Sequence, residues 1–462
     1  MSRLTREIFQ PRLQTSFQAP AEGLLMTNSR EYRSAISPIN WSGLNRSLVQ
    51  WILVLAIGTT PSVLAETYSV LYVFTGGADG ANPQAPLRLD SAGNLYGTTT
   101  FGGSGVCSPY GTCGVVFKLD STGTETVLHS FTGYPTDGAN PYSGVIRDSA
   151  GNLYGTAAFG GLTSSTCSPN GCGVVFRLDA SGKETVLYSF AGGADGSQPD
   201  ASLIRGLAGN LFGTTSFGGV TGVCVFGCGV VFKVNLTTRT EKVLYTFTGG
   251  TDGGGPTGNL IRDPAGNFYG TTAIGGLTSS ICYQGCGVVF KLDPIGTETV
   301  LYRFTAGADG EAPAAGLIRD STGNLYGTDG TGGLGLGVVF KLSPNGKLTV
   351  LHTFTGGSDG GHANSLIRDS AGNLYGTTFD GGDKTSTCST YGCGVVFKLD
   401  AAGKETVLHT FRGGADGANP QAGLVGDSAG SIYGTTLYGG APGGACGANG
   451  CGVVFKIKFD GP

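Results

Sequence analysis

The sequence predicts an all-β fold, a seven-bladed β-propeller of four-stranded antiparallel blades, and three observations lead to it. A phrase of the form NLYGT recurs at a nearly constant period, which is typical of solenoids and propellers. Each repeat carries four short apolar runs separated by turn residues, as blade strands do. One further run of this kind stands at the start of the repeat region, where it can close a ring. The phrase begins at Asn94, Asn152, Asn210, Asn267, Asn324, Asn373 and Ser431, at intervals of 58, 58, 57, 57, 49 and 58 residues.

Residues 1–65 precede the repeat region, and their pattern indicates a secretory signal peptide. The apolar run Leu48–Ile57 follows a basic residue and precedes small residues that end at Ala65, which is the order found in signal peptides. A membrane helix needs about 20 apolar residues, so we expect cleavage near Ala65 rather than an uncleaved anchor. Translation from Met26 is an alternative start. The product, residues 66–462, is then secreted or held at the cell surface (periplasmic or extracellular), without stable membrane insertion.

The second repeat shows how one blade is built. Its four apolar runs are Gly144–Arg147, Asn152–Thr156, Gly173–Leu178 and Thr185–Phe190. An Asp-x-x-Gly turn such as Asp148–Gly151 joins the first run to the second, and a similar turn joins the third to the fourth. Aspartate and glycine favour tight hairpin turns, so a four-stranded antiparallel unit follows.

The number of strands indicates how the propeller closes. The last repeat stops after its third strand, Gly452–Ile457, and the missing fourth strand is found as Ser69–Phe74. Pairing of these two segments removes an exposed sheet edge, which an open solenoid would leave. We therefore expect one propeller domain, 66–462, in which 66–74 completes the last blade.

The repeated phrases carry a family resemblance. GNLYGTT, the paired glycines and GVVFKLD resemble bacterial secreted proteins with GloVer tandem repeats, over Glu66 to Lys458. The paired glycines also resemble kelch blades, but kelch repeats are shorter and carry a tryptophan. Here both tryptophans, Trp41 and Trp51, lie in the leader. The resemblance implies export and surface display but no defined activity.

All 12 cysteines fall between the second and third strands, in pairs. The fifth repeat lacks both cysteines. Joint loss is expected if the two cysteines of a pair are bonded to each other. In an exported protein we expect six local disulfides. A structural zinc site needs four ligands, and each blade offers two. The pairs are Cys107/Cys113, Cys167/Cys172, Cys224/Cys228, Cys282/Cys286, Cys388/Cys393 and Cys446/Cys451.

An Asp-Gly recurs in every connector between a fourth strand and the next first strand, and these aspartates are the candidate binding residues. Calcium prefers several carboxylates within one loop, and each connector has one, so we expect no metal or cofactor. The alternative is that each aspartate only shapes a glycine turn. The residues are Asp79, Asp137, Asp195, Asp252, Asp309, Asp359 and Asp416.

The composition and the motifs limit the function. The chain has a formal net charge of −4 and no basic stripe, so nucleic acid is not an expected partner. No catalytic constellation is recognisable. We expect a monomeric binding or scaffold module for extracellular carbohydrate or protein. The alternatives are an extracellular polysaccharide lyase or hydrolase and a purely structural surface protein. Unique polar residues at the axis would indicate an enzyme, whereas a repeat scaffold would keep the axis symmetric.

The two ends of the predicted ring differ. The short Asp-x-x-Gly turns share one end, and the long connections with the cysteines and the Asp-Gly share the other. Binding residues usually lie on loops held by a rigid scaffold. We therefore expect any ligand on the disulfide-bearing face near the central opening, and an inert short-turn face.

Overall fold

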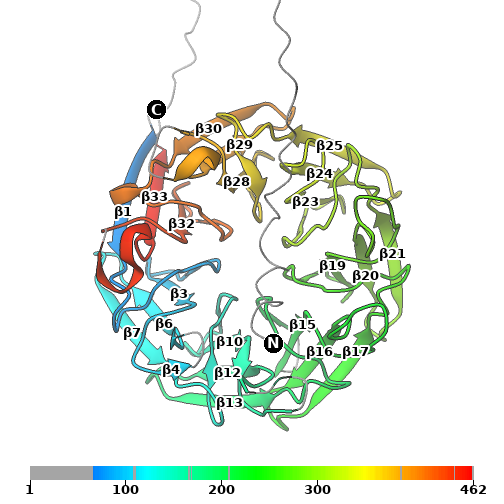
Figure 1. The fold of residues 1–462 in the computed structure, drawn as a ribbon, viewed down its shortest axis with the longest axis horizontal. Helices are drawn as coiled ribbons and strands as arrows, with labels where there is room; N and C mark the ends of the chain where they lie inside the picture. The colour runs from blue at the N-terminus through cyan, green and yellow to red at the C-terminus, as the bar shows by residue number, and fades with distance from the viewer. Residues whose placement is uncertain are drawn as a thin grey trace, which may run out of the picture. The chain divides into compact units, whose positions relative to one another are not determined.

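The computed structural model describes residues 66–459 except 108–110, 165, 166, 168, 207, 208, 385–387 and 442. The predicted signal peptide lies outside the described residues. In the described part, seven four-stranded antiparallel sheets form a ring (Figure 1), which confirms the predicted propeller. No helix in this part is long and apolar enough to cross a membrane.

Blades 1 to 4 are consecutive in the chain. Blade 1 contains β2 (Arg88–Leu89), β3 (Leu95–Thr99), β6 (Val115–Leu119) and β7 (Glu125–Ser130). Blade 2 contains β9 (Ile146–Arg147), β10 (Leu153–Ala157), β12 (Val174–Leu178) and β13 (Glu184–Ser189). Blade 3 contains β14 (Ile204–Arg205), β15 (Asn210–Thr215), β16 (Val230–Asn235) and β17 (Glu241–Thr246). Blade 4 contains β18 (Ile261–Arg262), β19 (Phe268–Thr272), β20 (Val288–Leu292) and β21 (Glu298–Arg303).

Blades 5 to 7 complete the ring. Blade 5 contains β22 (Ile318–Arg319), β23 (Leu325–Asp329), β24 (Val338–Leu342) and β25 (Leu348–Thr353). Blade 6 contains β27 (Ile367–Arg368), β28 (Leu374–Asp380), β29 (Val395–Leu399) and β30 (Glu405–Thr410). Blade 7 contains β31 (Val425–Gly426), β32 (Ile432–Thr436), β33 (Val453–Phe459) and β1 (Glu66–Val73).

Short elements lie in the connections on the disulfide-bearing face. They are β4 (Val106–Cys107), β5 (Gly111–Thr112), β8 (Gly138–Ala139), β11 (Phe159–Gly160), β26 (Gly361–Ala363) and the 3₁₀ helices η2 (Ser389–Tyr391), η3 (Gly414–Asp416) and η4 (Gly444–Asn449). The predicted strand bounds hold to within one or two residues, except that β1 begins at Glu66, three residues before the predicted Ser69. The first strand of each blade is shorter than predicted, because only two of its residues pair with the second strand.

The N-terminal strand closes the ring as predicted. β1 pairs antiparallel with β33 from Glu66↔Phe459 to Val73↔Val453, and the two strands lie side by side in Figure 1. The last blade is thus made from both ends of the repeat region, and β33 has no free edge.

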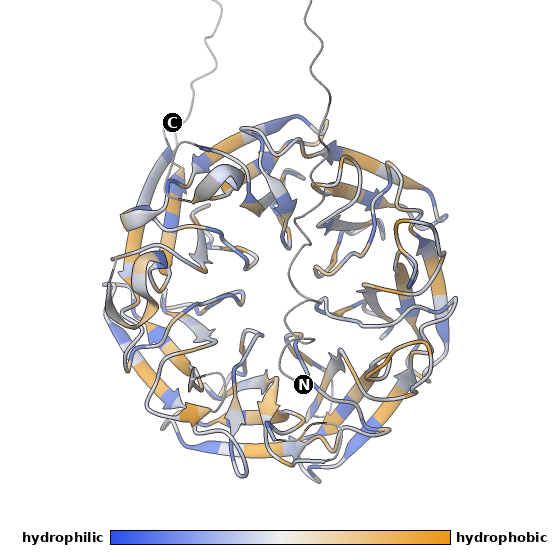
Figure 2. Cartoon of the chain, in the orientation of Figure 1, coloured by the Kyte–Doolittle hydropathy of each residue, from blue (hydrophilic) through white to orange (hydrophobic). Residues whose placement is uncertain are grey.

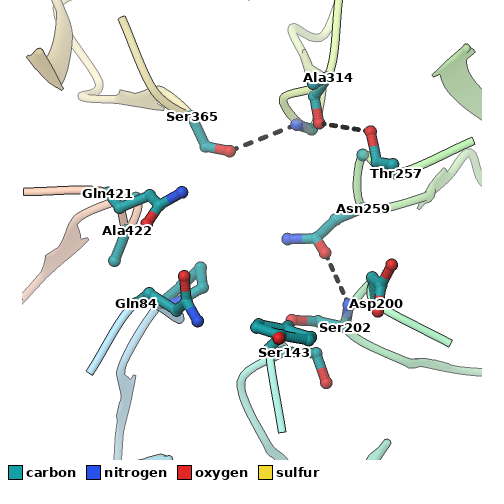
Figure 3. A pocket seen from close by; sticks show the side chains of 15 residues that line it. Gln84, Ser143, Asp200, Ser202, Thr257, Asn259, Ala314, Ser365, Gln421 and Ala422 are labelled. Carbon is teal, nitrogen blue, oxygen red and sulfur yellow. Dashed lines mark hydrogen bonds between the residues drawn. The ribbon is translucent and has the colours of Figure 1, made fainter. Parts of the chain in front are cut away.

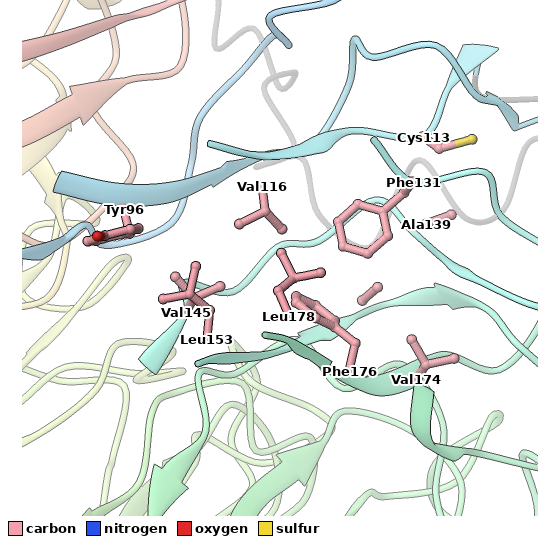
Figure 4. Packing of buried hydrophobic residues seen from close by; sticks show 11 residues of the cluster. Tyr96, Cys113, Val116, Phe131, Ala139, Val145, Leu153, Val174, Phe176 and Leu178 are labelled. Carbon is pink, nitrogen blue, oxygen red and sulfur yellow. The ribbon is translucent and has the colours of Figure 1, made fainter. Parts of the chain in front are cut away.

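The hydrophobic core lies between neighbouring blades. In one cluster, Val116 and Phe131 of blade 1 pack with Leu153, Phe176 and Leu178 of blade 2 (Figure 4). Figure 2 shows that the strands carry most of the hydrophobic residues, alternating with hydrophilic ones. This alternation places one row of side chains of each strand against the next blade.

A pair of buried phenylalanines joins each blade to the next. The phenylalanine that follows the fourth strand of one blade meets the phenylalanine of the third strand of the next blade, edge to face. Glycine of the NLYGT phrase makes room for the second ring, because a Cβ on Gly97 would lie 2.6 Å from Cζ of Phe117. The pairs are Phe74–Phe117, Phe131–Phe176, Phe190–Phe232, Phe247–Phe290, Phe304–Phe340, Phe354–Phe397 and Phe411–Phe455, with ring centroids 5.1 to 5.4 Å apart.

The paired glycines have a backbone role. Gly102 has a φ of 80°, and a Cβ on it would lie 2.3 Å from Cα of Gly80, the glycine of the Asp-Gly connector. The backbone of the second-to-third loop therefore lies directly on the backbone of the connector. This contact links the two long connections of each blade on one face.

We predict that deletion of residues 66–74 destabilises the propeller. The deletion exposes the edge of β33 and removes Phe74 from Phe117. The truncated protein should melt at a lower temperature than residues 66–462 or aggregate in size-exclusion chromatography. Phe74→Ala is the matched control, since it keeps the strand and should cost about 3–5 kcal/mol. An unchanged melting temperature after the deletion would show that β1 does not close the ring.

Candidate functional site

A polar hollow of about 110 Å³ lies where the seven blades converge on the axis (Figure 3). Its wall comes from the connectors that lead from a fourth strand to the next first strand. Side chains with amide or hydroxyl groups dominate the wall. The lining residues are Gln84, Pro86, Tyr142, Ser143, Asp200, Ser202, Thr257, Gly258, Asn259, Ala314, Gly316, Ser365, Gln421, Ala422 and Gly423.

The axis departs from the symmetry of the repeat. A proline precedes the first axis residue in six connectors, and the residue after it changes from blade to blade. The residues at this position are Gln84, Tyr142, Asp200, Thr257, Ala314 and Gln421. The strands around them repeat almost unchanged. By the criterion given from the sequence, different polar residues at the axis favour an enzyme, whereas a repeat scaffold would keep the axis symmetric. The variation therefore argues against a purely structural scaffold.

Hydrogen bonds between blades hold part of the rim. The backbone N–H of Ser202 donates to Oδ1 of Asn259 at 2.7 Å, and the N–H of Gly144 donates to Oγ of Ser202 at 3.1 Å. The N–H of Gly316 donates to Oγ of Ser365 at 3.3 Å (Figure 3). Each side chain thus accepts a bond from the blade before it, which fixes its position at the axis.

Two amides at the axis have defined orientations. Because Oδ1 of Asn259 accepts the N–H of Ser202, its Nδ2 faces the hollow (Figure 3), and no acceptor for it lies among the described residues. Nε2 of Gln84 donates to Oγ1 of Thr100, so its Oε1 is available to the hollow. The axis therefore presents one oriented donor and one oriented acceptor to a ligand.

Asp200 is the acidic residue of the wall. Its Oδ2 accepts a hydrogen bond from Oγ of Ser216 at 2.8 Å, and its Oδ1 is shielded from solvent without a hydrogen-bond partner in the described part. Burial raises the pKa of Asp200 to about 7. A carboxyl with such a pKa exchanges protons near neutral pH, so it can act as an acid or a base as well as a hydrogen-bonding group.

The predicted binding aspartates do not meet at the axis. Asp79 accepts hydrogen bonds from the backbone N–H of Thr75 at 2.7 Å and from the hydroxyl of Tyr72 at 3.1 Å. In blade 1, His129 takes the place of the tyrosine, with its Nε2 3.1 Å from Asp137. The other connectors repeat this arrangement. Each of these aspartates shapes its own turn beside an outer strand, and their binding of a ligand stays a prediction.

The same aspartates lie near a glutamate of the following blade. Burial, together with the charge of Asp79, raises the pKa of Glu125 to about 7. Four more glutamates at the same position have a pKa of about 7 for the same two reasons. They are Glu184, Glu241, Glu298 and Glu405. Blade 5 carries Leu348 instead.

Six disulfides staple the second-to-third loops, as predicted. They join Cys107–Cys113, Cys167–Cys172, Cys224–Cys228, Cys282–Cys286, Cys388–Cys393 and Cys446–Cys451. The sulfur atoms press on the connector that follows, since a Cβ on Gly249 would lie 2.7 Å from both Cys224 and Cys228. In blade 5, Leu336 fills this place against Gly356, which explains how that blade does without a disulfide.

The described residues contain no group of three or more His, Cys, Asp or Glu side chains placed to hold a metal ion. The axis residues were not among the candidates from the sequence. Their signal was the variable position after the connector proline, in a repeat that otherwise changes little.

Comparison with known proteins bears on the family and the fold. The family model of the Gloeobacter/Verrucomicrobia repeat matches residues 58–166, 108–335, 158–388 and 331–462. This match confirms the resemblance to GloVer repeats, while the likeness to kelch blades stays a prediction. No curated protein matches the chain in sequence.

Solved structures share the fold at low identity. Virginiamycin B lyase from Staphylococcus aureus has a TM-score of 0.52 and 11% identity, over 85% of this chain and 99% of that chain. The extracellular domain of a hybrid two component system from B. thetaiotaomicron has a TM-score of 0.50 and 14% identity, over 85% of this chain and 41% of that chain. The extracellular domain of a one component system from the same organism has a TM-score of 0.50 and 11% identity, over 84% of this chain and 39% of that chain. These identities show a common fold alone.

We predict that each disulfide contributes about 2 kcal/mol to stability, because it closes a small loop. Replacing Cys107 and Cys113 together by serine should lower the free energy of unfolding by that amount and leave the fold intact. Leu336→Ala in blade 5 is the matched control for loss of packing on the connector. Peptide mapping without reduction should find each cysteine bonded within its own blade; bridges between blades would contradict the pairing.

We predict that the melting temperature falls as the pH rises from about 5 to 8. The five glutamates with a raised pKa favour the protonated form in the folded state. Their stabilisation is complete below the unfolded pKa of 4.5 and is lost as the pH rises through about 7. Glu298→Gln and Glu405→Gln should flatten the profile measured by calorimetry. A melting temperature that rises over this range would contradict the assignment.

Proposed function

We propose that this chain, which belongs to the Gloeobacter/Verrucomicrobia repeat family, is an extracellular binding module for carbohydrate or protein whose ligand site is the hollow at the axis. The observation that carries the proposal is the set of different polar side chains that successive blades bring to equivalent axis positions. A binding site needs such convergent polar groups on a rigid support.

Several features support an extracellular location. Disulfides persist in oxidising compartments, and six are present here. Two of the similar structures are extracellular domains. We propose that the run Leu48–Ile57 acts as the signal peptide, with cleavage near Ala65.

The axis favours carbohydrate as the ligand. Nδ2 of Asn259 offers a donor and Oε1 of Gln84 an acceptor, and a sugar hydroxyl both accepts and donates. Protein ligands are usually anchored by aromatic or arginine side chains in apolar pockets, and this wall is mainly amide and hydroxyl. The hollow of about 110 Å³ is smaller than the roughly 300–1,000 Å³ of larger ligand clefts, so it suits one sugar unit at a chain end.

A second candidate is an extracellular enzyme of the polysaccharide lyase or hydrolase class. Two observations favour it. The polar residues at the axis differ between blades, which is the pattern expected of an enzyme, and Asp200 has a pKa of about 7, which suits a general acid or base. In this case the carboxyl transfers a proton to or from a sugar held by the same amides. Asp200→Asn would then abolish the release of new reducing or unsaturated chain ends and leave binding in place.

We predict that residues 66–462 bind a hydroxyl-rich oligosaccharide on a glycan array and that Asn259→Ser weakens the binding about 3- to 10-fold, the value of one neutral hydrogen bond. Blades 3 and 6 carry serine at this position, where it accepts the neighbouring N–H, so the rim should stay intact. Calorimetric titration measures the affinity.

Lys183→Ala, on an exposed short turn, is the control and should have no effect. Equal affinity of Asn259→Ser and the unaltered protein, with loss in Lys183→Ala, would move the site away from the axis. Binding of proteins but of no glycan would favour the protein ligand.

A further inference from the structure

A second pocket, of about 170 Å³, lies between blades 3 and 4. Phe212, Leu244, Phe268 and Pro294 form apolar walls, and three cationic residues share the lining. The pocket sits at the end of the blades that carries the short turns, opposite the disulfide loops. The cationic residues are Lys233, Lys242 and Arg262.

In the other blades, the corresponding position carries a carboxylate that offsets the positive charge. In six blades the first turn carries an aspartate whose carboxylate accepts the hydroxyl of a second-strand tyrosine, as in Asp148 with Tyr154 at 3.0 Å. The pairs are Asp90–Tyr96, Asp148–Tyr154, Asp263–Tyr269, Asp320–Tyr326, Asp369–Tyr375 and Asp427–Tyr433. In four of these six cases the next blade carries a first-strand arginine, and this arginine faces the pair. Arg147 lies 5.5 Å from the ring centre of Tyr96, and Arg205 interacts electrostatically with Asp148.

Blade 3 has lost both members of the pair. Gly206 stands in place of the aspartate and Phe212 in place of the tyrosine. The ring of Phe212 lies where the carboxylate would be, since a Cβ on Gly206 would be 2.4 Å from Cε2 of that ring. Loss of one partner alone would leave a buried polar group without its hydrogen bond, so their joint loss is physically consistent.

Arg262 keeps the position of its counterparts without their anionic partner. Its guanidinium lies over Gly266, 2.9 Å from where a Cβ would be, as that of Arg368 lies over Gly372. No carboxylate lies within ion-pair distance of Arg262 in the described part of the chain. The carboxylate of the adjacent Asp263 is bound to Asn267 and Tyr269 and interacts with Arg319 of the next blade.

The same pocket gains a further positive charge. Lys242 replaces the threonine or serine that stands at this position in most other blades, such as Thr185 and Thr299. Phe268 replaces a leucine or isoleucine of the second strand and lies 4.7 Å from Phe212 between ring centres. Blade 3 thus loses an acid and gains a base, and one aromatic ring from blade 3 and one from blade 4 lie beside them.

We propose that the pocket between blades 3 and 4 binds a ligand with an oxyanion group, such as a phosphate monoester, attached to a flat apolar ring. The fork of the Arg262 guanidinium suits paired contacts with two oxygens. Lys233 and Lys242 supply the remaining charge, and Phe212 and Phe268 pack against the ring. This site is separate from the axis, and it limits the hypothesis that the short-turn face is inert.

The probes are phenyl phosphate, inorganic phosphate and phenol, titrated into residues 66–462 by calorimetry at low salt. Phenyl phosphate should bind tightest, inorganic phosphate at least about 5-fold more weakly, and phenol without measurable affinity. Binding should weaken as salt is raised, because the charges are exposed to screening. Tightest binding by phenol, or equal binding by phosphate and phenyl phosphate, would overturn the ligand class.

The double variant Gly206→Asp/Phe212→Tyr restores the pair that six other blades carry, so it should fold and lose at least 10-fold in affinity for phenyl phosphate. Arg262→Leu is a second variant, since blade 1 carries Leu89 at that position. The converse double variant Asp148→Gly/Tyr154→Phe removes the carboxylate that interacts with the exposed Arg205, and it should create weak phosphate binding at blade 2. Unchanged affinity in folded Gly206→Asp/Phe212→Tyr and Arg262→Leu would exclude this pocket as the site.

Discussion

The edge-to-face contact between two phenylalanines at every blade boundary is the interaction on which the ring depends. Such a pair contributes about 0.5–1.5 kcal/mol beyond the burial of its area, and it recurs at all seven boundaries, including Phe74 with Phe117 across the closure. The second ring fits only because the NLYGT glycine, Gly97 in blade 1, has no side chain. NLYGT on the second strand and GVVF on the third strand therefore recur for the same reason: the glycine of the first makes room for the phenylalanine of the second.

This rigid ring determines where variation is possible. The connector of each blade is held by its aspartate, by the glycine contact of the Gly80 and Gly102 kind, and by the preceding disulfide. In blade 5, Leu336 takes the place of the disulfide against Gly356. Packing on the connector is therefore needed in every blade, but it does not have to come from a disulfide. The residues after the connector proline make none of these three contacts, and they are the residues that differ between blades at the axis.

The repeat explains how much of the molecule the sequence could predict. Strands, closure by β1 and the disulfide pairs all follow from features that the copies share. The axis residues could not be found in this way, because Asn259 and Gln84 matter through their difference from their counterparts. The connector aspartates were candidates because every repeat carries one. The contacts of Asp79 with Thr75 and Tyr72 show that this aspartate shapes the turn, which explains why it recurs. The leader lies outside the described residues, so its signal peptide stays a prediction.

Residues that differ from their counterparts in the other blades fall into two groups: those whose polar atoms have hydrogen-bond partners inside the blade and those whose polar atoms do not. Asp329 replaces a threonine in blade 5 and is buried, but its carboxylate accepts the backbone N–H groups of Gly332, Val338 and Glu311. Its oxygens therefore have partners inside the blade. Nδ2 of Asn259 has no acceptor among the described residues and faces a hollow. The guanidinium of Arg262 is exposed and lies over the ring of Phe268, and no carboxylate in the described residues pairs with it. An unpaired polar group is costly where it is buried, whereas water meets an exposed one. These departures, rather than the repeated residues, are the places where we propose that the propeller binds its ligands.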